Sequence, residues 1–196
     1  MKTQVWAHRG ASAYAPENTL EAFRLAAEMG ADGVELDVQL SRDGELVVAH
    51  DETIDRVSNG TGYIKDYTLA QLKKLSFNRL FPDFKDARIP TLKEVYELLK
   101  PAGLTVNVEL KTGIILYPEI EEKVLALTAS MGMEDRVIYS SFCHPSLVRL
   151  KELDSGLKTG LLYSDGWIDA AAYGRHTVGA DALHPALYHM QDPQLI

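Results

Sequence analysis

Two neighbouring stretches within the sequence GVELDVQLSRDGELVVAHD, residues 33–51, show regular patterns of apolar residues. The first stretch has an apolar side chain at every second position, and the second is a short continuous apolar run. Both patterns are typical of strands, and the Asp-Gly pair between them is a hairpin signal. The polar positions of the first strand hold two acids, Glu35 and Asp37, and the second strand ends on His50. Acids inside a strand and a histidine at the end of the next strand indicate that these side chains take part in binding or catalysis.

The rest of the chain gives strand-like and helix-like segments in alternation, which predicts a parallel sheet covered by helices. Asn18 is the expected N-cap of the first helix. The absence of a glycine-rich dinucleotide motif or a Walker A motif favours a (β/α)8 TIM barrel over an open Rossmann sheet. Expected strands cover residues 5–8, 34–40, 46–50, 105–110, 137–141, 159–163 and 182–184, and expected helices cover 19–29, 92–100, 146–153 and 168–173, with one more beginning near residue 118.

Two features modify this barrel. Residues 51–90 are rich in turn residues and predict a small insertion after the third strand. A barrel of this type usually has about 250 residues, whereas this chain has 196 and ends soon after its seventh strand. We therefore expect the eighth strand and the last helix to be missing. No linker or repeat divides the chain, so we expect residues 1–196 to form a single domain that includes the insertion.

Composition and charge narrow the class of protein. The net charge of −8 argues against non-specific nucleic-acid binding. The single cysteine, Cys143, excludes an internal disulfide and is compatible with a reducing compartment. The N-terminus has no apolar run of signal-peptide length, and no apolar stretch is long enough to cross a membrane. We expect a soluble, cytoplasmic protein without stable membrane insertion.

Three acids share the inward side of the expected barrel. Successive side chains of a strand point to opposite faces, so Glu35 and Asp37 lie on one face, and Glu109 takes the equivalent face of the strand at 105–110. Together they would repel one another strongly in a low dielectric. Each acid could form a structural ion pair with Arg or Lys. For the set of three we favour a hard divalent cation, Mg²⁺ or Ca²⁺, which prefers carboxylate oxygens.

Two histidines, His8 and His50, end expected strands, where the active sites of barrel enzymes lie. A lone histidine at such a place is more often a polar residue than a catalyst, but two beside the acids suggest a general acid–base pair. Arg9 and Lys111 add positive charge at the same rim. A metal, two cations and two histidines suit a phosphate ester, because charge must be neutralised and protons must be moved.

The other histidines and the cysteine are weaker candidates. His144, His176 and His189 are expected on the surface, and His184 ends the seventh strand and has a small chance of reaching the site. Cys143 has no evident partner histidine and is expected to be inert.

The chain contains several motifs in the order in which they occur in the glycerophosphodiester phosphodiesterase family, and it resembles that family through them. The paired HRG…PENT and ELDV…DG…VVAHD signatures are specific, and the resemblance extends over most of the chain. The motifs are AHRGASAYAPENTLEAF (7–23), GADGVELDVQLSRDGELVVAHDETIDRVSNGTG (30–62), IPTLKEV (89–95), NVELK (107–111) and SSF (140–142).

The resemblance implies a (β/α)8 barrel with a small insertion after the HD strand, and it implies a reaction. A glycerol hydroxyl next to the phosphorylated one attacks phosphorus, and a cyclic phosphate forms before water opens it. The products would be glycerol 3-phosphate and an alcohol such as choline or ethanolamine. The implied roles are acid–base catalysis by His8 and His50, metal binding by Glu35, Asp37 and Glu109, substrate binding by Arg9, Lys111 and Glu17, and support of the site loop by Asn18.

The sequence departs from the family where the last strand and helix are missing, which leaves a bare strand edge beside His8. Two alternative functions therefore stay open. One is a lysophospholipase D-type phospholipase, which would need an exposed apolar patch to reach a lipid. The other is a non-catalytic phosphate- or metal-binding barrel. The preferred head group, the choice between Mg²⁺ and Ca²⁺, and the oligomeric state are not fixed by the sequence, and an oligomer is compatible with it.

Overall fold

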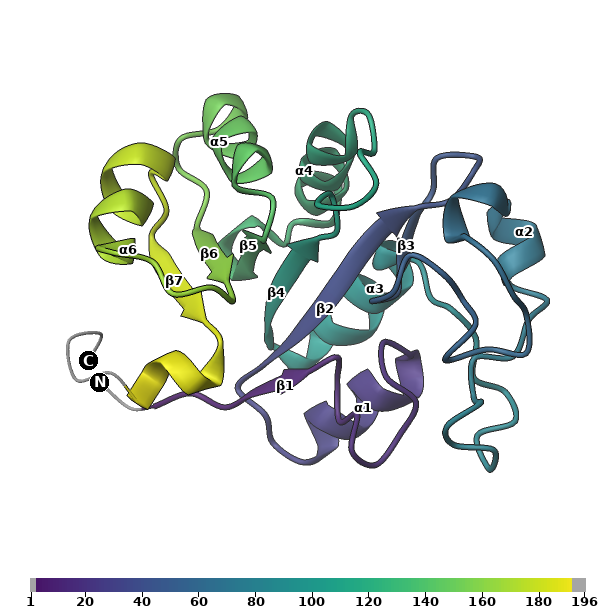
Figure 1. Ribbon diagram of the computed structural model, residues 1–196. Helices are drawn as coiled ribbons and strands as arrows, with labels where there is room; N and C mark the ends of the chain where they lie inside the picture. Colours follow the sequence, from purple (N-terminus) through teal and green to yellow (C-terminus); the bar gives the residue numbers. More distant parts are fainter. Residues whose placement is uncertain (1–2, 192–196) are drawn as a thin grey trace.

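The computed structural model describes residues 3–191 and shows a curled sheet with helices around its outer side (Figure 1). The strand order is β1-β2-β4-β5-β6-β7, and every neighbouring pair in this path is parallel. The strands are β1 (Trp6–His8), β2 (Gly33–Leu40), β3 (Leu46–Val48), β4 (Thr105–Leu110), β5 (Val137–Ser141), β6 (Thr159–Tyr163) and β7 (Ala182–Pro185). The α-helices are α1 (Leu20–Glu28), α2 (Leu69–Leu72), α3 (Leu92–Ala102), α4 (Ile120–Met131), α5 (His144–Leu153) and α6 (Ala170–Ala172).

The outer face of the sheet carries the main core. The apolar positions of β2 and β4 pair in register, for example Val34 with Val106 and Leu36 with Val108, and all four side chains are fully buried. Helix α3 covers this face with its own buried apolar residues, among them Tyr96. The alternation that predicted the strands is therefore explained: apolar residues meet the helices, and the intervening polar residues turn to the inner face.

Strand β3 differs from the others because it runs antiparallel to β2 as a hairpin, as its Asp-Gly turn indicates. Val48 lies opposite Val38, so β3 runs back along the end of β2. The backbone N–H of Ala49 then donates to the carbonyl oxygen of Asp37 at 3.0 Å. His50 therefore reaches the level of the inward-facing acids by a return path and does not end a parallel strand of the barrel.

The insertion after β3 forms a small apolar cluster of its own against the outer part of the hairpin. It contains α2 and several turns, which accounts for the turn-rich sequence. The buried members are Val47, Ala49, Ile54, Ile64, Leu72, Phe77 and Ile89.

Two features concern the C-terminal part of the chain. The helix expected at 168–173 is only three residues of α-helix, continued by a π-helical segment, Tyr173–Val178. Within residues 3–191, β1 pairs only with β2 and β7 only with β6, so the sheet is open between β7 and β1. Because β3 is antiparallel and lies off the main path, the described residues supply six parallel strands, and the sheet is an incomplete (β/α)8 barrel. In this part of the chain no helix has the length and apolarity needed to cross a membrane.

Candidate active site

Three carboxylates converge on the inner face of β2 and β4. Parallel pairing places Asp37 opposite Glu109 and Glu35 opposite Asn107, so the acids of both strands point the same way. One carboxylate oxygen of each acid lies within 4.8 Å of the corresponding oxygens of the other two. Their exposed fractions are 9% for Glu35, 1% for Asp37 and 8% for Glu109. The sequence prediction that these residues share one site is consistent with this geometry.

Burial and mutual repulsion make this cluster electrostatically demanding. Burial, together with the charges of Asp37 and Glu109, raises the pKa of Glu35 well above its ordinary value. Burial and the charge of Asp37 likewise raise the pKa of Glu109. The Oδ1 atom of Asp37 is buried without a hydrogen-bond partner. Buried oxygens with surplus negative charge fit a hard divalent cation, which binds carboxylates at short range.

Two cations partly neutralise the acids, so the ion-pair interpretation also holds in part. The Nζ atom of Lys111 lies 3.0 Å from Oε1 of Glu109 and 3.8 Å from Oδ1 of Asp37. The Nε atom of Arg9 lies 3.6 Å from Oδ2 of Asp37. Arg9 also donates from Nη1 to Oε1 of Glu17 at 3.1 Å, so its charge is shared with a fourth acid. The three clustered acids outnumber these two cations, so the cluster keeps surplus negative charge.

Arg9 and Asn18 hold the loop after β1 in an unusual backbone conformation. Both have positive φ angles, 57° and 56°. The backbone N–H of Arg9 donates to Oε2 of Glu35 at 3.0 Å, and Nδ2 of Asn18 donates to Oδ2 of Asp37 at 2.8 Å. The prediction that Asn18 caps α1 was wrong, because its amide serves Asp37. Thr19 is the cap and accepts from the N–H of Ala22.

The two predicted catalytic histidines reach the same charged region from different strands. The Nε2 atom of His8 lies 3.8 Å from Oε2 of Glu35, and most of the His8 side chain is exposed. Partial burial, and next the charge of Arg9, lower the pKa of His8. His50 also acts electrostatically on His8 and on Glu109. The site therefore has one open imidazole at β1 and one at the end of the β2–β3 hairpin.

Sequence reasoning missed Asp51 and Arg56, although both lie inside a quoted motif. Oδ1 of Asp51 is 2.7 Å from Nδ1 of His50. Partial burial opposes ionisation of Asp51, but hydrogen bonds from Arg56 and His50 lower its pKa to about 2. Arg56 contacts Asp51 and Glu17 together. The only signal in the sequence was the position of Asp51 next to His50; nothing pointed to Arg56.

The remaining histidines divide into three environments. His176 is exposed, as expected. His144 was predicted on the surface, but it is half-buried: its Nε2 lies 2.9 Å from the carbonyl oxygen of Leu162, and its ring packs edge-on against Trp167. His189 is also partly buried, with its ring stacked on Tyr163. These two histidines are therefore less exposed than predicted, because Trp167 and Tyr173 pack against His144 and Tyr163 at the end of β6 packs against His189.

His184 faces the inner side of β7, but its surroundings differ from those of His8 and His50. Its ring packs directly over Gly160 of β6, where a Cβ atom would lie 2.3 Å from the ring. Burial lowers the pKa of His184. Strands β5 and β6 separate β7 from β4 in the sheet order, so His184 belongs to the neutral part of the interior.

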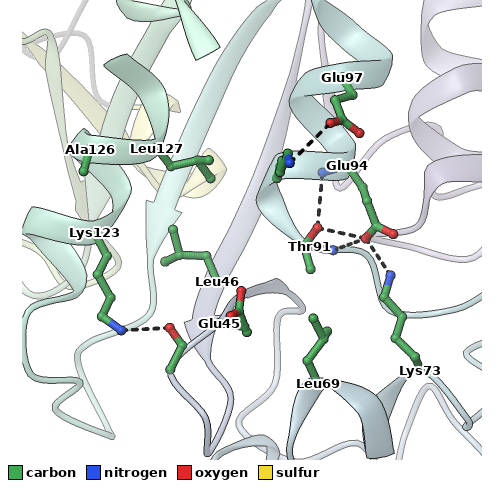
Figure 2. Close-up of a pocket in the computed structure, with 12 residues that line it drawn as sticks. Glu45, Leu46, Leu69, Lys73, Thr91, Glu94, Glu97, Lys123, Ala126 and Leu127 are labelled. Atoms are coloured by element: carbon green, nitrogen blue, oxygen red, sulfur yellow. Dashed lines mark hydrogen bonds and ion pairs between the residues drawn. The ribbon is translucent and has the colours of Figure 1, made fainter. Parts of the chain in front are cut away.

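A groove of about 580 Å³ lies outside the barrel, between the hairpin turn and helices α3 and α4 (Figure 2). Two of its lysines are already engaged: Lys73 lies 2.5 Å from Glu94, and Lys123 donates to the carbonyl oxygen of Gly44 at 2.9 Å. Neither the acidic cluster nor either candidate histidine lines it. This groove is therefore a different region from the candidate active site.

Comparisons with known proteins identify the family of this chain. The model of the glycerophosphoryl diester phosphodiesterase family matches residues 8–196. A protein of Caldanaerobacter subterraneus named glycerophosphodiester phosphodiesterase is 49% identical over all of this chain and 80% of its own length. A glycerophosphodiester phosphodiesterase structure from Agrobacterium tumefaciens is 32% identical, with a TM-score of 0.85 over 98% of this chain and 80% of that one.

A second solved structure adds a ligand. An Oleispira antarctica phosphodiesterase in complex with the product sn-glycerol-3-phosphate is 31% identical, with a TM-score of 0.82 over 98% of this chain and 81% of that one. The motifs, the barrel fold and these comparisons together show that this chain belongs to the glycerophosphodiester phosphodiesterase family of phosphoric diester hydrolases.

Proposed function

We propose that this protein hydrolyses glycerophosphodiesters to sn-glycerol 3-phosphate and an alcohol, with the help of a bound divalent cation. The observation that carries the proposal is the meeting of three buried carboxylates with two cations and His8, with His50 close enough to act electrostatically on Glu109. Family membership supports the reaction class. The relative that holds sn-glycerol-3-phosphate supports the identity of the phosphate product.

Glu35, Asp37 and Glu109 are the residues that would hold the cation. Their all-oxygen donor set suits Mg²⁺ or Ca²⁺. When bound, the cation would supply charge stabilisation and orientation of oxygen atoms.

Arg9 and Lys111 are the proposed phosphate-binding groups. Both stand at the edge of the carboxylate cluster, and Glu17 fixes the guanidinium of Arg9. Although burial opposes ionisation of Glu17, its hydrogen bonds with Arg56 and the nearby charges lower its pKa. Glu17 is therefore ionised at neutral pH and accepts from Arg9. In this arrangement Glu17 acts on the substrate through Arg9.

His8 and His50 are the proposed acid–base pair. One takes the proton of the glycerol hydroxyl adjacent to the phosphate as that oxygen attacks phosphorus. The other gives a proton to the departing alcohol, and water then opens the cyclic phosphate with the two roles exchanged. The ionised Asp51 accepts a hydrogen bond from Nδ1 of His50. This contact leaves Nε2 of His50 as the atom that exchanges protons.

An observation near His8 keeps the lysophospholipase D-type alternative as a second candidate. An apolar groove of about 400 Å³ runs beside β1 and is lined by His8 together with Val5, Tyr14 and Met29. These three apolar side chains are between 59% and 66% exposed. A lipid substrate needs such an apolar surface next to the reacting groups.

The test is release of the head-group alcohol, choline or ethanolamine, from a panel of glycerophosphocholine, glycerophosphoethanolamine and lysophosphatidylcholine, with the phosphate product identified as glycerol 3-phosphate for the first two and as lysophosphatidic acid for the third. The proposal expects turnover of the first two, loss of turnover with EDTA, and recovery with added Mg²⁺ or Ca²⁺. Preferential turnover of lysophosphatidylcholine would support the phospholipase reading. Binding of glycerophosphocholine without turnover under any metal condition would support a non-catalytic barrel.

Single-domain organisation and a cytoplasmic location stay predictions.

A further inference from the structure

We infer that Arg56, in the insertion after β3, is a positioning residue that holds the phosphate-binding arm and the acid–base arm of the site in one fixed arrangement. The inference rests on the proposed function for its kinetic consequences. Arg56 touches neither the carboxylate cluster nor the two histidines directly. It acts through Glu17 and Asp51.

The contacts of Arg56 use its guanidinium almost completely. Towards Asp51, Nε donates to Oδ2 at 2.7 Å and Nη2 donates to Oδ1 at 3.1 Å. Towards Glu17, Nη1 donates to Oε2 at 2.7 Å and Nη2 donates to Oε1 at 2.7 Å. Two carboxylates are thus each bound in a two-point geometry by a single planar group. Only arginine among the side chains can form such a pair of forks.

Each of these carboxylates has a second partner in the candidate active site. Oδ1 of Asp51 lies 2.7 Å from Nδ1 of His50, and Oε1 of Glu17 accepts from Nη1 of Arg9 at 3.1 Å. The result is a continuous chain of hydrogen bonds in the order Arg9–Glu17–Arg56–Asp51–His50. The orientation of Arg9 and that of His50 are therefore linked through one residue from outside the barrel strands.

A purely structural role would give Arg56 little importance. Its side chain is 40% exposed, and exposed ion pairs contribute little to folding stability. The network instead orients the carboxylates of Glu17 and Asp51, because a two-point contact fixes the plane of each carboxylate. Loss of Arg56 also leaves two acids beside each other without the cation between them. Loss of Arg56 should therefore alter the positions of His50 and Arg9, which these two acids hold.

The kinetic test compares Arg56→Ala and Arg56→Lys with Arg149→Gln. Arg149, on the surface of α5, is a matched control, since it donates from Nε and Nη2 to Oε1 of Glu122 on α4. We expect kcat/KM to fall about 100-fold in both Arg56 variants, the scale of a small misplacement of reacting groups. We expect the control to stay at the wild-type rate. All three proteins should keep the circular dichroism spectrum and melting temperature of the wild type to within a few degrees.

Chemical rescue separates positioning from packing. Added guanidinium chloride at tens of millimolar should restore part of the activity of Arg56→Ala, because the exposed site admits the ion. The same concentration of sodium chloride should not. Arg56→Lys, whose chain fills the space, should not respond. Wild-type activity in Arg56→Ala, or a folded Arg56→Ala protein that guanidinium fails to rescue, would overturn the inference.

A measurement without substrate keeps this inference distinct from the proposed function. The imidazole ¹⁵N resonances of His50 should show a single Nδ1–H tautomer in the wild type and a mixture in Arg56→Ala and Arg56→Lys. Identical His50 resonances in the wild type and both variants would overturn the positioning role. A wild-type protein that turns over no glycerophosphodiester, but shows the tautomer change, would remove the proposed function and retain the positioning of His50.

Discussion

The two halves of the sheet share one architecture but differ in what they turn inward. On β2 and β4 the inward residues include Asp37 and Glu109, which lie opposite each other. In the same register, the next inward residues are Ser140 on β5 and Gly160 on β6. The inward side chains therefore change from acidic residues on β2 and β4 to a serine on β5 and a glycine on β6. The barrel backbone provides equivalent positions on every strand, so the difference between the halves begins with the side chains that the strands turn inward.

The two halves also differ in how their side chains are supported. In the charged half, the loop after β1 adopts positive φ angles at Arg9 and Asn18, and the insertion contributes Arg56. In the neutral half, the His184 ring rests on Gly160. Functional groups thus lie where loops and the insertion converge on the strand ends. The predictions below test this contrast, from the largest expected effect to the smallest.

Removal of either histidine in the charged half should have the largest effect. His8→Ala and His50→Ala should each lower kcat by about 10²- to 10⁴-fold, the usual contribution of a general acid or base. The measurement is steady-state hydrolysis of glycerophosphocholine at saturating metal. Circular dichroism provides the folding control. A near-normal rate in either variant would remove that histidine from the proposed mechanism.

Glu35→Gln should have opposite effects on metal binding and on metal-free stability. Cation affinity should fall more than about tenfold, because even residues that only orient metal ligands contribute that much. Isothermal titration with Mg²⁺ and Ca²⁺ measures this fall. Unchanged titration would exclude Glu35 from the metal ligands.

The stability effect follows from the raised pKa of Glu35. A carboxyl whose pKa is higher in the folded than in the unfolded protein destabilises the fold as pH rises above its unfolded value near 4.5. The metal-free wild type should therefore lose stability above that pH, and Glu35→Gln should lose less. In EDTA at pH 7 the variant should melt higher, by about 2–4 °C for each kcal/mol gained. A lower melting point would contradict the repulsion described for the cluster.

His184→Ala tests whether the neutral half takes part in catalysis. We expect kcat/KM to change less than about twofold, together with a stability loss of about 0.5–3 kcal/mol from the lost packing over Gly160. Urea denaturation and the same hydrolysis assay separate the two quantities. A fall in kcat comparable to that of His50→Ala would place His184 in the active site.

Ser140→Ala should have the smallest effect. The Ser140 hydroxyl is fully buried and has no hydrogen-bond partner in the described structure. Removal of an unpaired buried hydroxyl costs little or stabilises slightly. The free energy of unfolding should stay within about 0.5 kcal/mol of the wild type or rise. A large loss would show that the hydroxyl binds a partner inside the barrel.

The parts of this structure that follow local rules could be predicted from the sequence. Strand periodicity fixed the common face of Glu35, Asp37 and Glu109, because side-chain alternation is a property of the backbone. The Asp-Gly turn indicated the hairpin that carries His50. Both inferences use residues near each other in the chain or equivalent positions of similar strands.

The parts that depend on distant contacts could not be predicted. The contact of Arg56 with Glu17 spans 39 residues and depends on how the insertion folds over the rim. Asn18 follows the rule for helix caps, yet a buried carboxylate on another strand engages its amide. His144 is enclosed by aromatic residues that follow β6. In each case tertiary packing overrides the local preference.

The hairpin between β2 and β3 makes the length of a surface turn a determinant of chemistry. The turn closes with the N–H of Ser41 donating to the carbonyl oxygen of Glu45, and Gly44 supplies the required positive φ of 79°. One inserted residue there would slip the pairing, reverse the face of every β3 side chain and displace His50 by about 3.4 Å. Insertions in this turn should therefore inactivate the protein while the barrel itself stays folded.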